Sequence, residues 1–243
     1  MRVLLIGDIH SNLEALRQVL DHAHDNGGFH SVWCLGDIVG YGPDPIACLD
    51  IIRDLTPTVV AGNHDRAAAG LIPIDTCNEY AAEACRWTTR SLDQGHIDYL
   101  KALPLSHTEG SFTMVHGSLR DPVWEYLVDQ QAALATFGLL ETGRCLVAHS
   151  HIPFVCRESE DGPQFERLPE GVATPLGQGR TIINPGSVGQ PRDGDPRAAY
   201  ILLDTDLATV TLHRISYDIP TTQEKMARAD LPAPLIDRLS LGR

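Results

Sequence analysis

The stretch R-V-L-L-I-G-D-I-H, residues 2–10, places an acid and a histidine directly after a short apolar run. A continuous apolar run that ends at a glycine is typical of a strand buried on both faces. Ser11 and Glu14 follow with the spacing of a capping box, and leucine and valine then recur at helical intervals as far as Gly27 and Gly28. We therefore expect a buried strand over residues 2–7 and a helix after it.

The same plan of strand and helix is repeated downstream. An apolar run over residues 31–36 predicts a second buried strand, and Asp44 with Pro45 caps and opens a helix that reaches about Leu55. A third apolar run covers residues 58–61. Strands that alternate with helices in this way predict parallel pairing in the first part of the chain.

The rest of the chain changes from helices to closely spaced strands. We expect a helical insert over about 78–103, a strand over 112–116, a helix from Asp129 to Leu140, a strand over 144–148, and a helical tail over about 220–243. Between 154 and 217 the pattern predicts strands joined by turns, over 154–159, 164–168, 180–184, 198–203 and 209–217. The whole pattern predicts an α/β fold, a two-sheet β-sandwich flanked by helices, in a single domain over residues 1–243.

The composition excludes several classes of function. Among the 243 residues, 19 lysines and arginines stand against 32 aspartates and glutamates, and the net charge of −13 argues against binding to duplex nucleic acid or to anionic membranes. No apolar run has the length of a membrane helix. The six cysteines form no C-x-x-C pair and several lie in apolar segments, which favours reduced core thiols and a cytoplasmic location.

Polar side chains follow five of the predicted strands at the point where each strand ends. These side chains carry carboxylate, amide or imidazole groups, and they are Asp8, His10, Asp37, Asn63, His116, His149 and His151. The carboxyl ends of strands in an α/β sheet are where ligands bind, so we expect these side chains to meet. Oxygen and imidazole ligands of this kind suit first-row metals, and the sequence therefore predicts a metal site.

The number of these ligands favours two divalent ions over one. Seven ligands would leave a single octahedral ion no open position for a substrate, whereas a shared carboxylate can bridge two ions. Three or four imidazoles disfavour magnesium and suit manganese, iron, nickel or zinc. The other histidines, His22, His24, His30, His96, His107 and His213, lie outside any such motif, and we assign them no role.

Five ordered motifs carry a family resemblance: G-D-I-H at 7–10, G-D-I-V-G at 36–40, G-N-H-D at 62–65, V-H-G at 115–117 and H-S-H at 149–151. Over residues 1 to about 204 the chain resembles the calcineurin-like metallophosphoesterase superfamily. The run N-P-G-S-V-G-Q-P-R at 184–192 is similar to its small bacterial phosphodiesterase branch. The resemblance implies hydrolysis of a small phosphoester by in-line attack of a hydroxide that bridges two ions, with manganese preferred.

The resemblance also implies a role for each ligand. One ion would be held by Asp8, His10, Asp37 and His151, and the other by Asp37, Asn63, His116 and His149. His64 would be the catalytic histidine, bound to neither ion, and Asp65 could orient it. Arg120 and Arg192 are candidates for contacts with the phosphate, because the arginine-bearing D-R-G segment of protein phosphatases is replaced here by Gly40-Tyr-Gly42.

Several alternatives stay open. A phosphodiesterase is the first choice, and a nucleotide or dinucleoside polyphosphate hydrolase and a phosphomonoesterase share the same metal core. A non-catalytic scaffold is the alternative of another class, although a scaffold has no need of His64. A nuclease would require a basic track, which the acidic composition disfavours. The loop over 184–192 is either a structural corner or part of the site, and Trp124 is either core or pocket wall.

Overall fold

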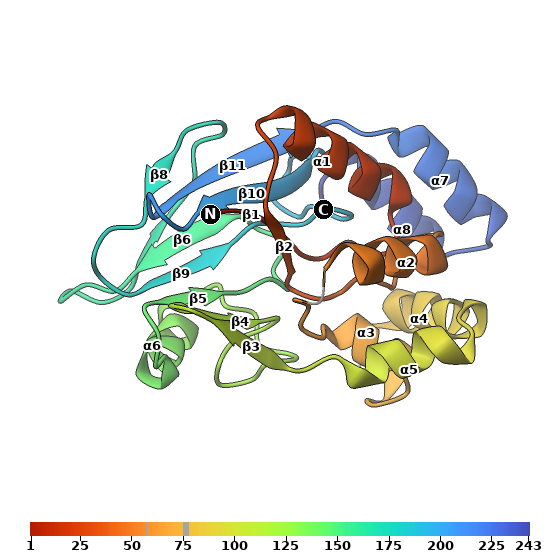
Figure 1. Ribbon diagram of the computed structural model, residues 1–243. Coiled ribbons are helices and arrows are strands. Elements are labelled where there is room, and N and C mark those ends of the chain that lie inside the picture. Colours follow the sequence, from red (N-terminus) through yellow and green to blue (C-terminus); the bar gives the residue numbers. More distant parts are fainter. Residues whose placement is uncertain (57, 75–77) are drawn as a thin grey trace.

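The structure is a computed structural model that describes residues 1–56, 58–74 and 78–243. Two sheets pack face to face, with helices on the outside (Figure 1). The first sheet has the order β2 (Ser31–Cys34), β1 (Arg2–Ile6), β10 (Ala198–Asp204), β11 (Thr209–Ile215), β8 (Thr174–Pro175). The second has the order β3 (Ser106–Glu109), β4 (Phe112–Val115), β5 (Arg144–Leu146), β9 (Thr181–Asn184), β6 (Phe154–Arg157), β7 (Gln164–Glu166). The expected two-sheet α/β fold is confirmed.

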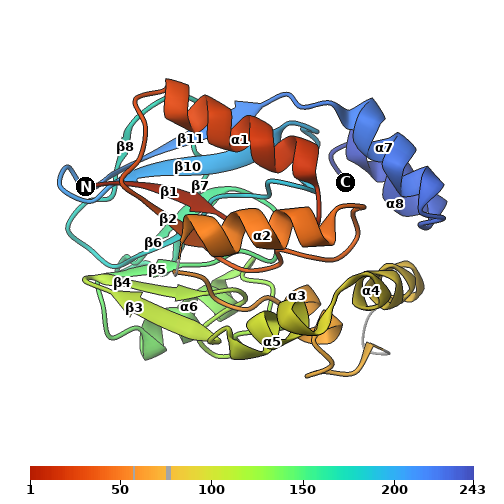
Figure 2. The same ribbon diagram turned by 45° about the vertical axis from the view of Figure 1, so that its right-hand side comes forward.

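The helices cover both outer faces and one end of the sandwich. They are α1 (Leu13–Asp25), α2 (Pro45–Leu55), α3 (Asn63–Ala68), α4 (Glu79–Ser91), α5 (Gln94–Ala102), α6 (Gln130–Leu139), α7 (Ile219–Arg228) and α8 (Ala233–Asp237), followed by the 3-10 turn η2 (Arg238–Ser240). Helices α1 and α2 lie on the first sheet and α6 lies on the second. Helix α7 packs beside α1, so the C-terminal segment returns to the N-terminal part of the fold (Figure 2).

Alternation along β1 divides the core into two layers. Val3 and Leu5 point between the sheets, whereas Leu4 and Ile6 point toward the helices, and all four are fully buried. Because successive strand residues face opposite sides, a continuous apolar run is what a strand packed on both faces requires. Each such side chain contributes about 1.5–3 kcal/mol when it is fully buried. This packing fixes the strand ends from which the polar loops emerge.

The predicted third strand over residues 58–61 is wrong. Val59 forms one isolated bridge to Cys34, and the Ala61 amide donates to the Pro104 carbonyl oxygen at 2.8 Å. The chain then turns into α3, which leaves too few residues for a ladder. In the first sheet β1 is parallel to β2 but antiparallel to β10. Among the described residues of the first part of the chain, the expected parallel pairing therefore holds for β1 with β2 and for the single Cys34–Val59 bridge.

The predicted capping box of the first helix is also wrong. Asn12 caps α1, because its Oδ1 accepts a hydrogen bond from the Ala15 amide at 3.2 Å. Ser11 has a left-handed backbone, with φ of 54°, and its amide donates to the Ile38 carbonyl oxygen. The loop contact with the segment after β2 therefore takes Ser11 away from the cap position.

Four of the six cysteines, Cys34, Cys48, Cys145 and Cys156, are buried free thiols, and Cys85 is also buried. Cys77 lies outside the described residues. Within the described part of the chain, no helix has both the length and the apolar character that crossing a membrane requires.

Candidate metal centre

All seven predicted ligands come together at one end of the sandwich. Asp8 and His10 follow β1, Asp37 follows β2, and Asn63 opens α3, while His116 follows β4 and both His149 and His151 follow β5. None of the seven side chains is more than 4% exposed. Tertiary packing of two different sheets thus gathers side chains that are up to 143 positions apart in the sequence.

The carboxylates of Asp8 and Asp37 are held in the same way. In each, one oxygen accepts a hydrogen bond from a main-chain amide and the other oxygen has no hydrogen-bond partner. Oδ2 of Asp8 accepts the His149 amide at 3.1 Å, and Oδ1 of Asp37 accepts the His64 amide at 2.8 Å. Oδ1 of Asp8 and Oδ2 of Asp37 are buried without a hydrogen-bond partner. A buried carboxylate oxygen that lacks a donor is costly unless a cation satisfies it.

Three of the histidines have their ring orientation fixed by the main chain. The Nδ1 atoms of His10, His116 and His151 contact the carbonyl oxygens of Val39, Leu35 and Gln190, respectively. A carbonyl oxygen only accepts hydrogen bonds, so Nδ1 carries the proton in the neutral ring and the lone pair of Nε2 faces the cluster. This tautomer is the one that ligates a metal through Nε2.

The bare atoms form two groups that share Asp37. In the first, Nε2 of His151 lies 3.1 Å from Nε2 of His10 and 3.3 Å from Oδ1 of Asp8. In the second, Nε2 of His116 lies 3.3 Å from Oδ2 of Asp37, 3.2 Å from Nδ1 of His149 and 3.3 Å from Oδ1 of Asn63. Nε2 of His10 lies 3.7 Å from Oδ2 of Asp37, which links the groups. Lone pairs that converge at such distances fit divalent cations.

Burial and the neighbouring charges set the protonation of these groups. Burial holds the pKa values of His10 and His151 well below their usual range and lowers that of His149 to about 3. Burial opposes ionisation of Asp37, but the His116, His64 and His10 rings together outweigh it and hold the carboxyl pKa well below its ordinary value. His116 is the exception among the four histidines, because against the effect of burial the charge of Asp37 raises its pKa to about 9. The neutral rings of His10, His149 and His151 beside ionised Asp37 are donors that first-row divalent metals prefer.

Backbone strain is concentrated at the same residues. Asp8, His10, Asp37, His149 and His151 all have left-handed φ values, between 49° and 65°. A non-glycine residue in this region costs on the order of 1–3 kcal/mol, and such strain persists only where the surrounding structure enforces it. The fold therefore maintains five of the seven predicted ligands in unfavourable conformations.

The loop over 184–192 is one element that enforces these conformations. The Ser187 hydroxyl and the Gly189 amide both donate to the Asp8 carbonyl oxygen, at 2.8 and 2.9 Å. A Cβ on Gly189 would lie 1.8 Å from the Ile9 carbonyl oxygen, so only glycine fits there. This loop braces the end of β1 and, through the Gln190 carbonyl oxygen, orients His151, while its last residue, Arg192, reaches the pocket.

His64 lies beside the cluster without joining its hydrogen bonds. Its Nδ1 is buried with no partner, and a Cβ on Gly40 would come within 2.5 Å of that atom. Burial lowers the pKa of the His64 ring to about 4. The expectation that Asp65 orients His64 is wrong, because the Asp65 carboxylate accepts the amides of Ile38, Val39 and Gly62.

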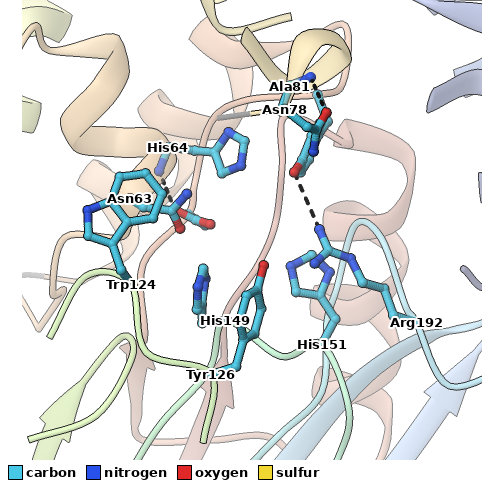
Figure 3. A pocket seen from close by; sticks show the side chains of 11 residues that line it. Asn63, His64, Asn78, Ala81, Trp124, Tyr126, His149, His151 and Arg192 are labelled. Atoms are coloured by element: carbon cyan, nitrogen blue, oxygen red, sulfur yellow. Dashed lines mark hydrogen bonds between the residues drawn. The ribbon is translucent and has the colours of Figure 1, made fainter. Parts of the chain in front are cut away.

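A cavity of about 190 Å³ opens above the cluster (Figure 3). Its lining includes His64 and Arg192, and also Trp124, which settles that residue as pocket wall. Arg120 is not in the lining, because its guanidinium forms an ion pair with Glu125 and its side chain is 45% exposed. The structure thus brings one of the two candidate arginines to the pocket.

Two tyrosines in the site were not predicted from the sequence. The Tyr41 ring lies 4.6 Å from that of His10 and 4.3 Å from that of His64, and Tyr126 stacks on His149 at 4.0 Å. The position of Tyr41 between two glycines directly after the Asp37 motif was an available signal. No pattern in the sequence marks Tyr126, whose loop is placed by tertiary contacts.

Comparison with known proteins agrees with this geometry. An uncharacterized protein of Methanocaldococcus jannaschii is 40% identical, over 99% of this chain and 98% of its own. A crystal structure of a metallophosphoesterase from Sphaerobacter thermophilus matches with a TM-score of 0.90 and 43% identity, over 100% of this chain and 99% of that one. A symmetrical bis(5'-nucleosyl)-tetraphosphatase of Dechloromonas aromatica is 31% identical, over 51% of this chain and 46% of its own.

The fold, the site and these relatives together define a metal-dependent phosphoester hydrolase. A family model for the calcineurin-like phosphoesterase superfamily domain matches residues 1–207. The chain belongs to this superfamily, as its motifs predict. The family and its tetraphosphatase relatives favour an enzyme over the non-catalytic scaffold.

Proposed function

We propose that this chain is a phosphodiesterase that acts on a small substrate at a centre of two divalent metal ions, with manganese the preferred ion. Asp8, His10, Asp37 and His151 would hold one ion, and Asp37, Asn63, His116 and His149 the other. The bare oxygens of Asp8 and Asp37 and the inward-facing imidazole lone pairs fit such ions. Bound there, the ions would supply an activated water for in-line attack and neutralise charge on the phosphoryl oxygens.

The pocket lining is the observation that favours a diester over a monoester. Among the described lining residues, Tyr41, Trp124 and Tyr126 provide three aromatic walls, whereas Arg192 is the one lysine or arginine. A phosphomonoester dianion is best held by several cationic groups, whereas a diester carries a single charge and two organic substituents that pack on aromatic surfaces. The lining therefore supports a substrate with an organic group on each side of the phosphate.

The side chains around the cavity have separate tasks in this reaction. Arg192 would bind a phosphoryl oxygen and orient the substrate. His64, whose Nδ1 has no partner, would protonate the leaving oxygen or donate a hydrogen bond to it. Trp124 and Tyr126 would shield the reacting group from bulk water and set the position of the organic substituent.

The test is turnover of bis(p-nitrophenyl) phosphate and p-nitrophenyl phosphate by metal-stripped protein that is resupplied with manganese, nickel, zinc or magnesium. We expect a higher kcat/KM for the diester, with manganese the most effective ion and magnesium the least. A preference for the monoester would contradict the phosphodiesterase assignment and favour a phosphomonoesterase. A larger stimulation by magnesium than by the transition metals would contradict the proposed ligand chemistry.

A second candidate function is hydrolysis of dinucleoside polyphosphates. It is favoured by the tetraphosphatase relatives, of which the chain spans about half the length. Diadenosine tetraphosphate should be included in the same assay, with product analysis by ion-exchange chromatography. A kcat/KM for this compound well above that for thymidine 5'-(p-nitrophenyl phosphate), a nucleotide diester, would replace the first assignment with the second.

A further inference from the structure

Two arginines from distant parts of the chain lie against one tyrosine at the edge of the pocket. The guanidinium carbons of Arg192 and Arg238 are each 5.8 Å from the centre of the Tyr41 ring. Nη2 of Arg192 also donates to the Tyr41 hydroxyl at 3.4 Å. Arg192 ends the loop that braces Asp8, whereas Arg238 belongs to η2, beyond the residues that the family model matches. The C-terminal segment therefore places a cation against a tyrosine that lines the pocket.

These two arginines differ from most of the ion-paired arginines on this acidic protein in what surrounds them. Arg120, Arg157, Arg180, Arg197 and Arg214 each form an ion pair with a glutamate or an aspartate. In the described parts of the chain, no Asp or Glu side chain lies within 4 Å of Arg192 or Arg238. Nε of Arg192 is buried without a partner, and Nε of Arg238 donates to the main-chain oxygen of Arg243.

The two guanidinium groups are close enough to repel each other. Burial and then the charge of Arg192 lower the pKa of Arg238, whose side chain is half-buried. Holding two like charges together without an anion costs free energy, and a phosphate bound between them would return it as charge-assisted hydrogen bonds. The two guanidinium groups therefore offer cationic donors that a bound phosphate would engage.

The C-terminal segment holds Arg238 firmly in this place. Lys225 on α7 donates to Glu14 at 2.5 Å and to Asp44 at 3.0 Å, which ties the segment to α1 and to the start of α2. Leu239, next to Arg238, is buried in one apolar cluster with Tyr41. These contacts order the arginine before any substrate arrives, which lowers the entropic cost of binding.

Arg192 and Arg238 lie near enough to His64 for one substrate to contact the arginines with one group and His64 with another. The Tyr41 ring centre is 4.3 Å from that of His64 and 5.8 Å from the Arg238 guanidinium, so the guanidinium lies within about 10 Å of the His64 ring. We propose that Arg192, Tyr41 and Arg238 form a subsite for a second phosphate group of the substrate, beyond the phosphoester that is cleaved. This subsite rests on the proposed function, because it assumes that the scissile group binds at the metal cluster.

The test compares two substrates that differ by one phosphate: thymidine 5'-(p-nitrophenyl phosphate) and its 3'-phosphorylated form. Both release p-nitrophenol, so the ratio of their kcat/KM values isolates the contribution of the second phosphate. For the unmodified enzyme we expect a ratio of about ten or more in favour of the phosphorylated form, the tenfold corresponding to one charge-assisted hydrogen bond. Arg238→Gln should reduce this ratio at least about fivefold, mainly through KM, and Arg238→Lys should restore part of it.

Arg228→Gln is the matched control, since Arg228 lies in the same C-terminal segment but is exposed and paired with Glu224. It should keep the ratio of the unmodified enzyme. A general loss of structure in Arg238→Gln would lower both kcat/KM values and leave the ratio unchanged, and that result would overturn the proposal. A ratio near one in the unmodified enzyme would overturn it as well.

A binding measurement separates this proposal from the proposed function. Calorimetry on the metal-loaded protein should show tighter binding of thymidine 3',5'-bisphosphate than of thymidine 5'-phosphate, and Arg238→Gln should remove the difference. If neither nitrophenyl ester is turned over while this preference is present, the phosphodiesterase assignment fails and the subsite stands. Equal affinity for the two nucleotides refutes the subsite, whatever the enzyme hydrolyses.

Discussion

The floor and the rim of the pocket are built in different ways. The floor consists of the seven predicted metal ligands, Asp8, His10, Asp37, Asn63, His116, His149 and His151, and each of them is nearly inaccessible to solvent. The rim consists of Trp124, Tyr126 and Arg192, which are half-buried or exposed and come from loops. Arg238, from the C-terminal segment, lies against the Tyr41 ring beside this rim. Main-chain hydrogen bonds fix the floor, whereas side-chain packing places the rim. The comparison teaches that main-chain contacts fix the predicted metal ligands, whereas the side chains around them depend on how loops and the C-terminal segment pack.

The strongest test of the floor is removal of the carboxylate that links its two groups. Asp37→Asn keeps the size of the side chain but removes the charge that attracts both ions, so we expect loss of bound metal and a fall in kcat/KM of at least about 10³-fold. Metal content by plasma mass spectrometry, together with turnover, checks this. Asp54→Asn, at an exposed position in α2, is the control and should retain both. Full metal occupancy in Asp37→Asn would show that the floor does not depend on this bridge.

The next test separates catalysis from metal binding within the buried part of the site. His64→Ala should retain both metal ions, because His64 is not among the seven predicted ligands, yet kcat should fall about 10²–10⁴-fold. The measurement is kcat alongside metal content for the same preparation. Turnover equal to that of the unmodified enzyme would remove the assigned role of His64.

A third test asks whether the main chain really fixes the floor. Gly189→Ala places a Cβ against the Ile9 carbonyl oxygen, so we expect a loss of about 1–3 kcal/mol in the free energy of unfolding together with weaker metal binding. Denaturant unfolding and metal titration give the two values. Gly138→Ala on α6 has open space around its Cβ and should not destabilise the protein. Unaltered metal affinity in Gly189→Ala would mean that the brace is dispensable.

The smallest effect is expected at the rim. Arg192→Ala should raise KM about tenfold for a nucleotide diester and change kcat much less, since a residue that holds the substrate equally in the ground and transition states contributes to binding alone. Steady-state kinetics with thymidine 5'-(p-nitrophenyl phosphate) provide both constants. An equal fall in kcat and in kcat/KM would instead show that Arg192 contacts the substrate only in the transition state. The rim would then take part in the chemical step as the floor does.

Most of the fold could be predicted because its strands are buried on both faces and are therefore apolar throughout. The run over residues 58–61 has the same composition as those strands but forms a single bridge, since the main chain there pairs with Pro104 and turns into α3. Short strands such as β8 at Thr174–Pro175 carry no pattern at all. The apolar composition of a segment predicts that the segment is buried. It does not predict with which other segment its main chain forms hydrogen bonds.

For the site, the sequence identified the side chains but not their surroundings. The carbonyl oxygens of Leu35 and Gln190 orient two of the histidines, and a carbonyl group is present in every residue. From the sequence, Arg120 and Arg192 are equal candidates for contacts with the phosphate. The structure distinguishes them, because Arg120 forms an ion pair with Glu125. Tyr126 and Arg238 had no motif, because their positions depend on loops and on a segment that docks from the far end of the chain.

The sequence by itself determined the class of fold, the donor set and the family, because buried strands need apolar runs and metal ligation needs particular atoms. Only the tertiary structure decided which oxygens of Asp8 and Asp37 are left without a partner, which nitrogen of each ring faces the cluster, and which of the two candidate arginines reaches the pocket. The physical reason is that ligand identity is a property of single residues. Orientation and charge neutralisation, in contrast, arise from contacts between residues that the chain brings together only when it folds.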